Sequence, residues 1–166
     1  ANTLTINVTS VNDAPTGSNA TITILEDGSK TFAAADFGFA DAADGASPNS
    51  LSAVIITTLP TAGTLKLNGT AVTVNQTISV GNLGNLVYAP GANANGDNYA
   101  TIGFKVQDDG GTANSGANTS VAANTLTINV TSINDAPTGS DKTITILEDG
   151  SKTFAAADFG FADVTD

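Results

Sequence analysis

The chain has 166 residues, of which 16 are acidic and five are lysine, and it lacks arginine, histidine and cysteine, so its formal net charge is −11. This charge argues against a nucleic-acid partner, because phosphate contacts need clustered basic residues. The missing cysteine excludes disulfides and thiolate metal sites. No apolar run reaches the ~18 residues of a membrane-spanning helix, so no membrane insertion is expected.

Polar and apolar residues alternate along the first part of the chain, as they do in half-buried β-strands. In residues 3–11 the apolar positions are Leu4, Ile6 and Val8, and the same period of two recurs over 18–25. Both stretches are therefore predicted to be strands.

The centre of the chain contains further strand patterns. Residues 51–59 are β-branched and apolar, which is typical of a central strand. Asn68-Gly69 favours a two-residue type I′ turn, so 64–67 and 71–74 are predicted to form a hairpin. Other expected elements are strands over 86–89 and 99–106, a last strand leading to Asn134, single helical turns over 32–37 and 78–83, and a flexible surface loop over 108–123.

About eight short strands with turn residues between them predict an all-β protein built as a sandwich of two sheets. The hydrophobic content of 40% is sufficient to fill the core of one such sandwich. The long glycine-rich and asparagine-rich gaps fit the turns of this architecture.

The strongest pattern in the sequence is an internal repeat. Residues 1–44 align without gaps with 123–166, and 39 of the 44 pairs are identical. The differences are Val11/Ile133, Asn19/Asp141, Ala20/Lys142, Ala42/Val164 and Ala43/Thr165. Such self-similarity is typical of tandem arrays, in which repetition serves to increase the length of the protein and the number of its binding units.

The motif Asn-Asp-Ala-Pro marks the predicted joints between repeats, at residues 12–15 and 134–137. Proline restricts φ and removes a ladder donor, so a strand is expected to stop there. The sequence therefore predicts the last strand and linker of a preceding repeat over 1–13, one complete repeat over 14–135, and the first strands of a following repeat over 136–166.

Several motifs together resemble a known group of repeats. They are TILEDGSKTF, LPTAGTLKLNG, NANGDNYATIGFKVQDDGG and the closing TLTINVTSINDAP. They resemble the cadherin-like and immunoglobulin-like tandem repeats of giant bacterial surface adhesins, the RTX type exported by type I secretion. The resemblance implies Greek-key sandwiches joined end to end, Ca²⁺ as the ligand, and a role in adhesion and biofilm at the extracellular surface of a bacterial cell.

The acidic residues fall where strands are expected to end. A strand over 18–25 would run ~25 Å and carry Glu26 and Asp27 to the downstream end of the sandwich. The returning strand would bring Asp36, Asp41 and Asp44 back to the upstream end, and strand parity suggests the same end for Asp108 and Asp109. Asp97 is a further candidate for the downstream end.

Each joint is therefore expected to gather oxygen ligands for Ca²⁺, which takes six to eight of them. The joint within the chain would use Glu26, Asp27, Asn134, Asp135, Asp158, Asp163 and Asp166. The other joint would use Asn12, Asp13, Asp36, Asp41 and Asp44, with Asp108 and Asp109, and Glu148 and Asp149 repeat the roles of Glu26 and Asp27 in the next repeat.

Simpler alternatives exist for these residues. Asp, Asn and Gly also form turns without any metal, and net negative charge also serves solubility. Catalysis has little support, because the chain lacks histidine, cysteine and arginine and has no aromatic platform for a sugar.

Two functions remain, and neither is enzymatic. One is an extender repeat of a secreted adhesin, stiffened by Ca²⁺ and contacting neighbouring repeats of the same chain. The other is a subunit of an extracellular filament or matrix, in which identical chains complete one another by strand addition.

Overall fold

The computed structural model describes residues 1–44 and 48–163 and divides the chain into two compact units, Ala1–Thr131 and Ser132–Asp166. In the described ranges no helix has the length and apolar character needed to cross a membrane.

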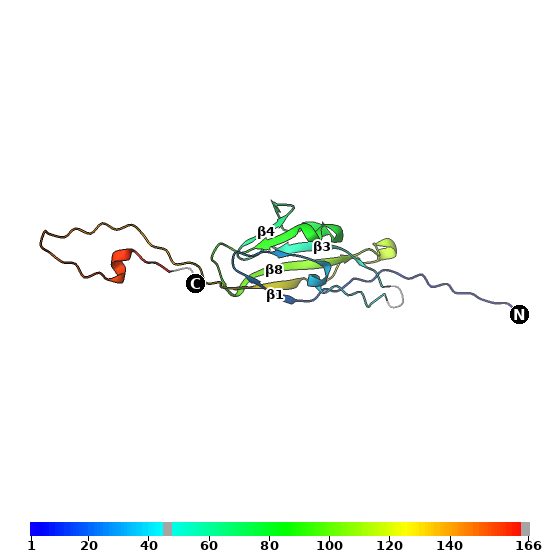
Figure 1. The fold of residues 1–166 in the computed structure, drawn as a ribbon. Helices are drawn as coiled ribbons and strands as arrows, with labels where there is room; N and C mark the ends of the chain where they lie inside the picture. The colour runs from blue at the N-terminus through cyan, green and yellow to red at the C-terminus, as the bar shows by residue number, and fades with distance from the viewer. Residues whose placement is uncertain (45–47, 164–166) are drawn as a thin grey trace. The chain divides into compact units, whose positions relative to one another are not determined.

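The first unit contains two β-sheets (Figure 1). The larger sheet has the strand order β1-β9-β8-β3-β6, and the smaller has the order β2-β7-β4-β5. The larger sheet consists of β1 (Ala20–Leu25), β9 (Asn124–Thr131), β8 (Gly96–Asp108), β3 (Leu51–Thr58) and β6 (Thr77–Ser79). The smaller consists of β2 (Lys30–Thr31), β7 (Leu86–Ala89), β4 (Thr64–Leu67) and β5 (Thr70–Ala71). Short 3₁₀ turns are η1 (Ala34–Phe37), η2 (Val80–Asn85) and η3 (Ala113–Ser115).

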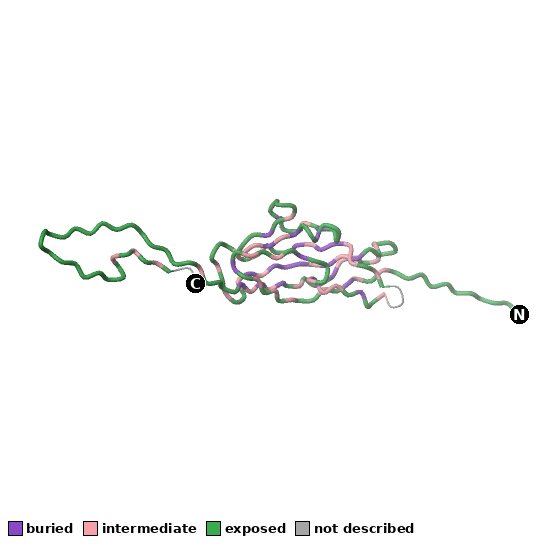
Figure 2. Tube along the Cα trace, in the orientation of Figure 1, coloured by how far each residue is buried: buried purple, intermediate pink, exposed green. Residues whose placement is uncertain are grey.

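Side chains from both sheets fill one hydrophobic core between them. Ile56, Phe104 and Ile128 come from the larger sheet and Tyr88 from the smaller, and each is at most 1% exposed. Buried segments accordingly follow the inner strands in Figure 2. The predicted all-β class with two packed sheets is confirmed.

The pairing of strands defines the two ends of this sandwich. β1 runs parallel to β9, from Ala20 opposite Leu126 to Leu25 opposite Thr131, whereas β8 runs antiparallel to β9. We call the end where β1 and β9 begin and β8 finishes the upstream end. The opposite end, where β1 and β9 finish, is the downstream end.

Most of the predicted strands occur, with small shifts of their bounds. The Asn68-Gly69 hairpin is confirmed, since both residues have the positive φ of a type I′ turn, 49° and 79°. The sequence pattern missed β2 and β6, because two or three residues are too few to show a period. The helical turns expected over 32–37 and 78–83 appear as η1 and η2.

One expectation is wrong, and another is right only in part. Residues 3–11 form no strand in the described chain, and Leu4, Ile6 and Val8 are 86%, 76% and 91% exposed, because a strand needs a ladder partner as well as a pattern. The segment 108–123 lies mostly at the surface, as expected, but it is tied to β8. Its Asn118 carbonyl accepts a hydrogen bond from the Asp108 amide at 2.9 Å, and Ser120 is buried.

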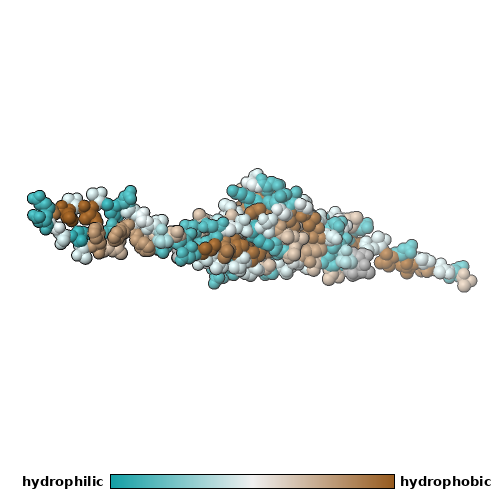
Figure 3. Space-filling model, in the orientation of Figure 1, coloured by the Kyte–Doolittle hydropathy of each residue, from teal (hydrophilic) through white to brown (hydrophobic). Residues whose placement is uncertain are grey.

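The second unit contains an isolated bridge between Thr138 and Ala162 and the 3₁₀ turn η4 (Ala156–Phe159). Its large apolar side chains are exposed, including Leu147, Phe154, Phe159 and Phe161, which are 61–84% accessible. Brown hydrophobic side chains are visible in this part of the chain in Figure 3.

The two copies of the repeated segment share their turns and one bridge, but they differ in strands and in burial. The bridge of the second unit corresponds to Thr16–Ala40 in the first, and Asp27 and Asp149 have nearly equal φ of 57° and 60°. Phe32 and Phe37, the counterparts of Phe154 and Phe159, are however 2% and 0% exposed. Local geometry is thus set by the segment itself, and burial by the rest of the sandwich.

Tyr88 gives a testable consequence of this packing. Its hydroxyl donates to the Ala62 carbonyl at 2.9 Å, and burial, with a further effect of Tyr99, raises the pKa of Tyr88 to about 12. The folded protein therefore keeps a proton that the unfolded chain releases near pH 10. Stability from this group should be complete below pH 10 and be lost as the pH rises towards 12.

We expect the denaturant midpoint to fall over that pH range in the wild-type chain. Tyr88→Phe should flatten the decline, whereas Tyr99→Phe should keep most of it, because burial is the larger cause of the raised pKa. An equally steep decline in Tyr88→Phe would show that another group is responsible.

Candidate cation site at the upstream end

Asn12 is the hub of the upstream end. Its side-chain amide nitrogen donates to Asp108 Oδ1 at 3.1 Å, to the Gly111 carbonyl at 3.1 Å and to the Ala117 carbonyl at 2.8 Å. In return the Ala117 amide donates to the Asn12 carbonyl at 2.8 Å. Three acceptors thus surround a nitrogen with two hydrogens, so the oxygens outnumber the protons that can satisfy them.

Asn49 links this hub to two further aspartates. Its side-chain nitrogen donates to Asn12 Oδ1 and, at 2.8 Å, to Asp44 Oδ2. Its backbone amide donates to Asp41 Oδ2 at 2.6 Å. The Asp13 amide donates to Asp44 Oδ1 at 3.0 Å. The linker, the residues Asp41, Asp44 and Asn49, and the loop after β8 therefore meet at one place.

Two carboxylates of this cluster are buried and incompletely satisfied. Asp41 is 8% exposed and Asp108 is 2% exposed. Among the described residues, Asp41 Oδ1 and Asp108 Oδ2 are enclosed and have no hydrogen-bond partner. Burying a carboxylate oxygen without a partner costs stability unless a cation or donor compensates.

A hollow of about 210 Å³ opens beside the cluster, lined by Ser10, Asn12, Asp44, Asn49 and Gly110. Its walls are rich in oxygen, and Gly110 leaves room for the Asn12 side chain, which a Cβ there would overlap. In residues 1–44 and 48–163, however, no three acidic side chains converge as a ready metal group. A cation here would also need Asn12, backbone carbonyls or water as ligands.

The remaining predicted residues of this end differ in their placement. Asp109 lies at the upstream end, where its Oδ1 accepts from the Ser50 amide at 2.8 Å. Asp13 is exposed and contributes its backbone to the cluster.

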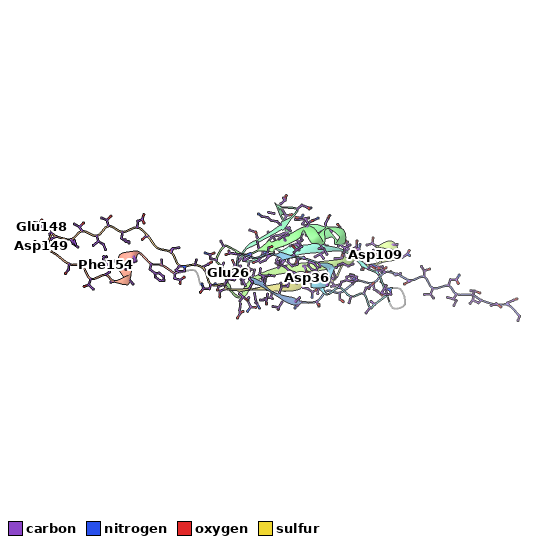
Figure 4. All side chains as sticks on the ribbon, viewed as in Figure 1. Glu26, Asp36, Asp109, Glu148, Asp149 and Phe154 are labelled. Carbon is purple, nitrogen blue, oxygen red and sulfur yellow. The ribbon has the colours of Figure 1, made fainter. Side chains whose placement is uncertain are left out.

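Asp36 and its counterpart Asp158 make their contacts within their own turns. Asp36 pairs with Lys30 at 2.9 Å and accepts from the Ala33 amide at 2.8 Å. Asp158 pairs with Lys152 at 3.1 Å and accepts from Ala155 in the same way. Figure 4 shows Asp36 between the two ends of the sandwich, marked by Glu26 and Asp109. The Phe37 carbonyl of η1 accepts from the Ser18 amide just before β1. The side chain of Asp36 is joined to Lys30 and Ala33 rather than to Asn12.

The downstream end gathers a second polar group. Glu26 follows β1, is 2% exposed, and accepts from the Asn95 side chain at 3.4 Å. Asp27 Oδ1 accepts from the Asn93 amide at 3.2 Å, and Asp97 follows Gly96, which pairs with Val130 at the end of β9. The antiparallel course of β8 thus brings the 93–97 loop to the residues that follow β1.

The other predicted ligands lie in the second unit. Asn134 donates to the Asp135 carbonyl at 2.9 Å. Glu148 and Asp149 are exposed at a turn whose residues are labelled in Figure 4, and Asp163 is exposed next to Ala162. Asp166 lies outside the described residues.

Sequence reasoning missed Asn49, Asn93 and Asn95. Asn93 and Asn95 lie in a segment rich in Asn, Gly and Ala, where a single amide has no distinguishing neighbour, and Asn49 stands between Pro48 and Ser50 with no acidic residue beside it. The Asn12 contacts to Gly111 and Ala117 use backbone oxygens, which leave no signal in a sequence. The predicted position of Asp108 at the upstream end, by contrast, agrees with the pairing of β8.

Comparisons with protein-family models, with curated proteins and with solved structures find no match to this chain.

The Asn12 hub can be tested by a matched pair of substitutions. Asn12→Ala removes hydrogen bonds to one carboxylate and two carbonyls, so it should lower the free energy of unfolding by about 1–3 kcal/mol. Asn134→Ala changes the same motif in the second unit, where the side chain contacts its neighbour's backbone, and should change it by less than about 0.5 kcal/mol. Equal effects in chemical denaturation would contradict a special role for Asn12.

Proposed function

We propose that the chain is an extender segment of a secreted bacterial surface adhesin, in which Ca²⁺ stiffens the joints between sandwich repeats. In this role the segment gives the adhesin length and rigidity, and it catalyses no reaction. The single observation that carries the proposal is the pair of buried carboxylate oxygens, Asp41 Oδ1 and Asp108 Oδ2, beside the linker residue Asn12.

The chemistry of the cluster favours calcium over other metals. It offers carboxylate, amide and carbonyl oxygens, which Ca²⁺ accepts in numbers of six to eight with flexible geometry. The chain has no histidine or cysteine, the nitrogen and sulfur ligands on which zinc sites are usually built. An irregular oxygen set of this kind also suits Ca²⁺ better than the strict octahedron of Mg²⁺.

The contacts of Asn12 suggest how a cation would stiffen the joint. Asn12 and Asp13 belong to the linker, and their partners Asp44, Asp108 and Ala117 lie in the sandwich repeat that follows it. A cation held between these segments would add bonds stronger than hydrogen bonds. Without it, the mutual repulsion of Asp41, Asp44 and Asp108 would favour loosening of the same contacts.

The strand order supports the finer fold assignment in this proposal. The runs β9-β8-β3 and β2-β7-β4 have the order of the strands G-F-C and B-E-D of an immunoglobulin-like Greek-key sandwich. In such a sandwich the chain enters at one end and leaves at the other, which allows repeats to be joined end to end.

A second candidate function is a subunit of an extracellular filament. It is favoured by the exposure of Leu4, Ile6 and Val8 and of the apolar side chains of the second unit. Exposed apolar segments of this kind can pair with other chains by strand addition.

The calcium proposal predicts a metal-dependent stability. At a Ca²⁺ concentration 100 times Kd, the folded state should gain about 2.7 kcal/mol, which thermal unfolding would record as a higher Tm. Asp108→Asn and Asp41→Asn should abolish most of this gain, because they remove an anionic ligand.

Two matched controls sharpen this test. Asp36→Asn alters an aspartate paired with Lys30, and Asp163→Asn alters the counterpart of Asp41 in the second unit. Both variants should keep the calcium response. An identical Tm with calcium and with chelator in the wild-type chain would refute the proposal.

A further inference from the structure

Asn49 lies within the upstream cluster, two residues before β3 begins, and its backbone is held in place. Its amide donates to Asp41 Oδ2 at 2.6 Å. The next residue, Ser50, donates its amide to Asp109 Oδ1 at 2.8 Å, and its carbonyl accepts from the Asp109 amide at 3.1 Å. The sandwich therefore fixes the position from which the Asn49 side chain reaches the linker.

The side chain of Asn49 uses both hydrogens of its amide nitrogen. Nδ2 donates to Asn12 Oδ1 and, at 2.8 Å, to Asp44 Oδ2. Two oxygens from separate parts of the chain, one in the linker and one after η1, therefore converge on a single nitrogen. Because an amide nitrogen carries two N–H groups, protein donors alone satisfy both contacts.

A half-turn of this amide would change the chemistry of the contact. The nitrogen and oxygen of an asparagine amide are nearly equal in size, so rotation about the last side-chain bond exchanges a donor for an acceptor. After such a rotation Asn49 Oδ1 would face Asn12 Oδ1 and Asp44 Oδ2 with no proton between them. Three oxygens in this arrangement repel one another, whereas a cation placed among them attracts all three.

Such a set of oxygens suits Ca²⁺, which binds amide and carboxylate oxygens at about 2.3–2.6 Å. Further ligands would come from the buried carboxylates of Asp41 and Asp108 and from water in the adjoining hollow, which Asn49 lines. The same side chains therefore suit two states. In one state N–H groups hold the oxygens together, and in the other a cation does.

The surroundings of the Asn49 amide are compatible with this rotation. In the part of the chain that the structure describes, the hydrogen bonds of the Asn49 side chain all come from its nitrogen, so the rotation breaks no bond to Oδ1. Gly110 packs against the pair, since a Cβ there would overlap both Asn12 Oδ1 and Asn49 Nδ2. A glycine at this position leaves the space that the two amides occupy.

We propose that Asn49 is a switchable ligand of the calcium site, an inference that rests on the function proposed above. Without a cation its Nδ2 donates to Asn12 and Asp44, and with Ca²⁺ bound the amide turns and Oδ1 becomes a ligand. The oxygens of the site are thereby kept in position before the cation binds, which lowers the cost of binding. The linker is attached in both states, and more weakly in the state without the cation.

The test measures the calcium Kd by isothermal titration, and Tm in chelator, for four full-length chains. They are the wild type, Asn49→Ala, Asn49→Asp and the control Gln76→Ala. Gln76 is half-buried, as Asn49 is, and its side-chain oxygen accepts from the Thr73 amide at 2.9 Å within its own turn. The control should therefore keep the calcium Kd of the wild type.

The two Asn49 variants should agree in Tm and differ in Kd. Asn49→Ala removes both the donor and the ligand, so its Tm in chelator should fall by roughly 5 °C and its Kd should rise roughly tenfold or more. Asn49→Asp removes the donor and keeps a ligand oxygen. Its Tm in chelator should fall at least as far, because a like charge is added to the cluster, while its Kd should be no higher than that of the wild type.

A Kd of Asn49→Ala equal to or below that of the wild type would overturn the proposal, because an amide that only donates would compete with the cation. A raised Kd in Asn49→Asp would overturn it as well, and this variant gives the answer if alanine prevents folding. An unchanged Tm in chelator for both variants would contradict the donor role. No calcium binding by the wild type would instead refute the calcium function itself, so the two failures are distinguishable.

Discussion

The parallel pairing of β1 with β9 is the interaction on which the arrangement of this protein depends. It places the residues that follow both strands, Glu26 and Thr131, at the downstream end, where the Glu26 amide donates to the Thr131 carbonyl at 2.9 Å. The antiparallel β8 then ends with Asp108 at the opposite end. Polar groups therefore collect at the two ends of the sandwich, while apolar side chains fill the core between the sheets.

At the upstream end, carboxylates are buried where few donors and few positive charges are available to stabilise them. Buried carboxylates favour either a cation or several donors, yet within residues 1–44 and 48–163 one oxygen each of Asp41 and Asp108 has no hydrogen-bond partner. The chain has only five lysines to balance 16 acidic residues, and Lys30 already pairs with Asp36. A divalent cation from solution would neutralise part of this negative charge. It would at the same time attach the linker to the sandwich.

The repeated segment shows how much of such a fold its sequence determines. The turn, the left-handed glycine and the Lys–Asp pair form in both copies, because their partners lie within a few residues. β1 forms only where β9 lies beside it, and Phe37 is buried only where Phe104 is present. Periodicity accordingly predicted the main strands and the position of Asp108. It could not predict Asn49 or the role of backbone carbonyls, which depend on contacts between distant segments.

The central claim is that a cation belongs between the linker and the buried carboxylates. It is tested most directly by diffraction from crystals of the chain grown with Ca²⁺, with anomalous scattering used to locate the metal. The account predicts a calcium peak about 2.3–2.6 Å from a carboxylate oxygen of Asp108 or Asp41. Both carboxylates in the same positions, with no cation within that distance, would contradict it.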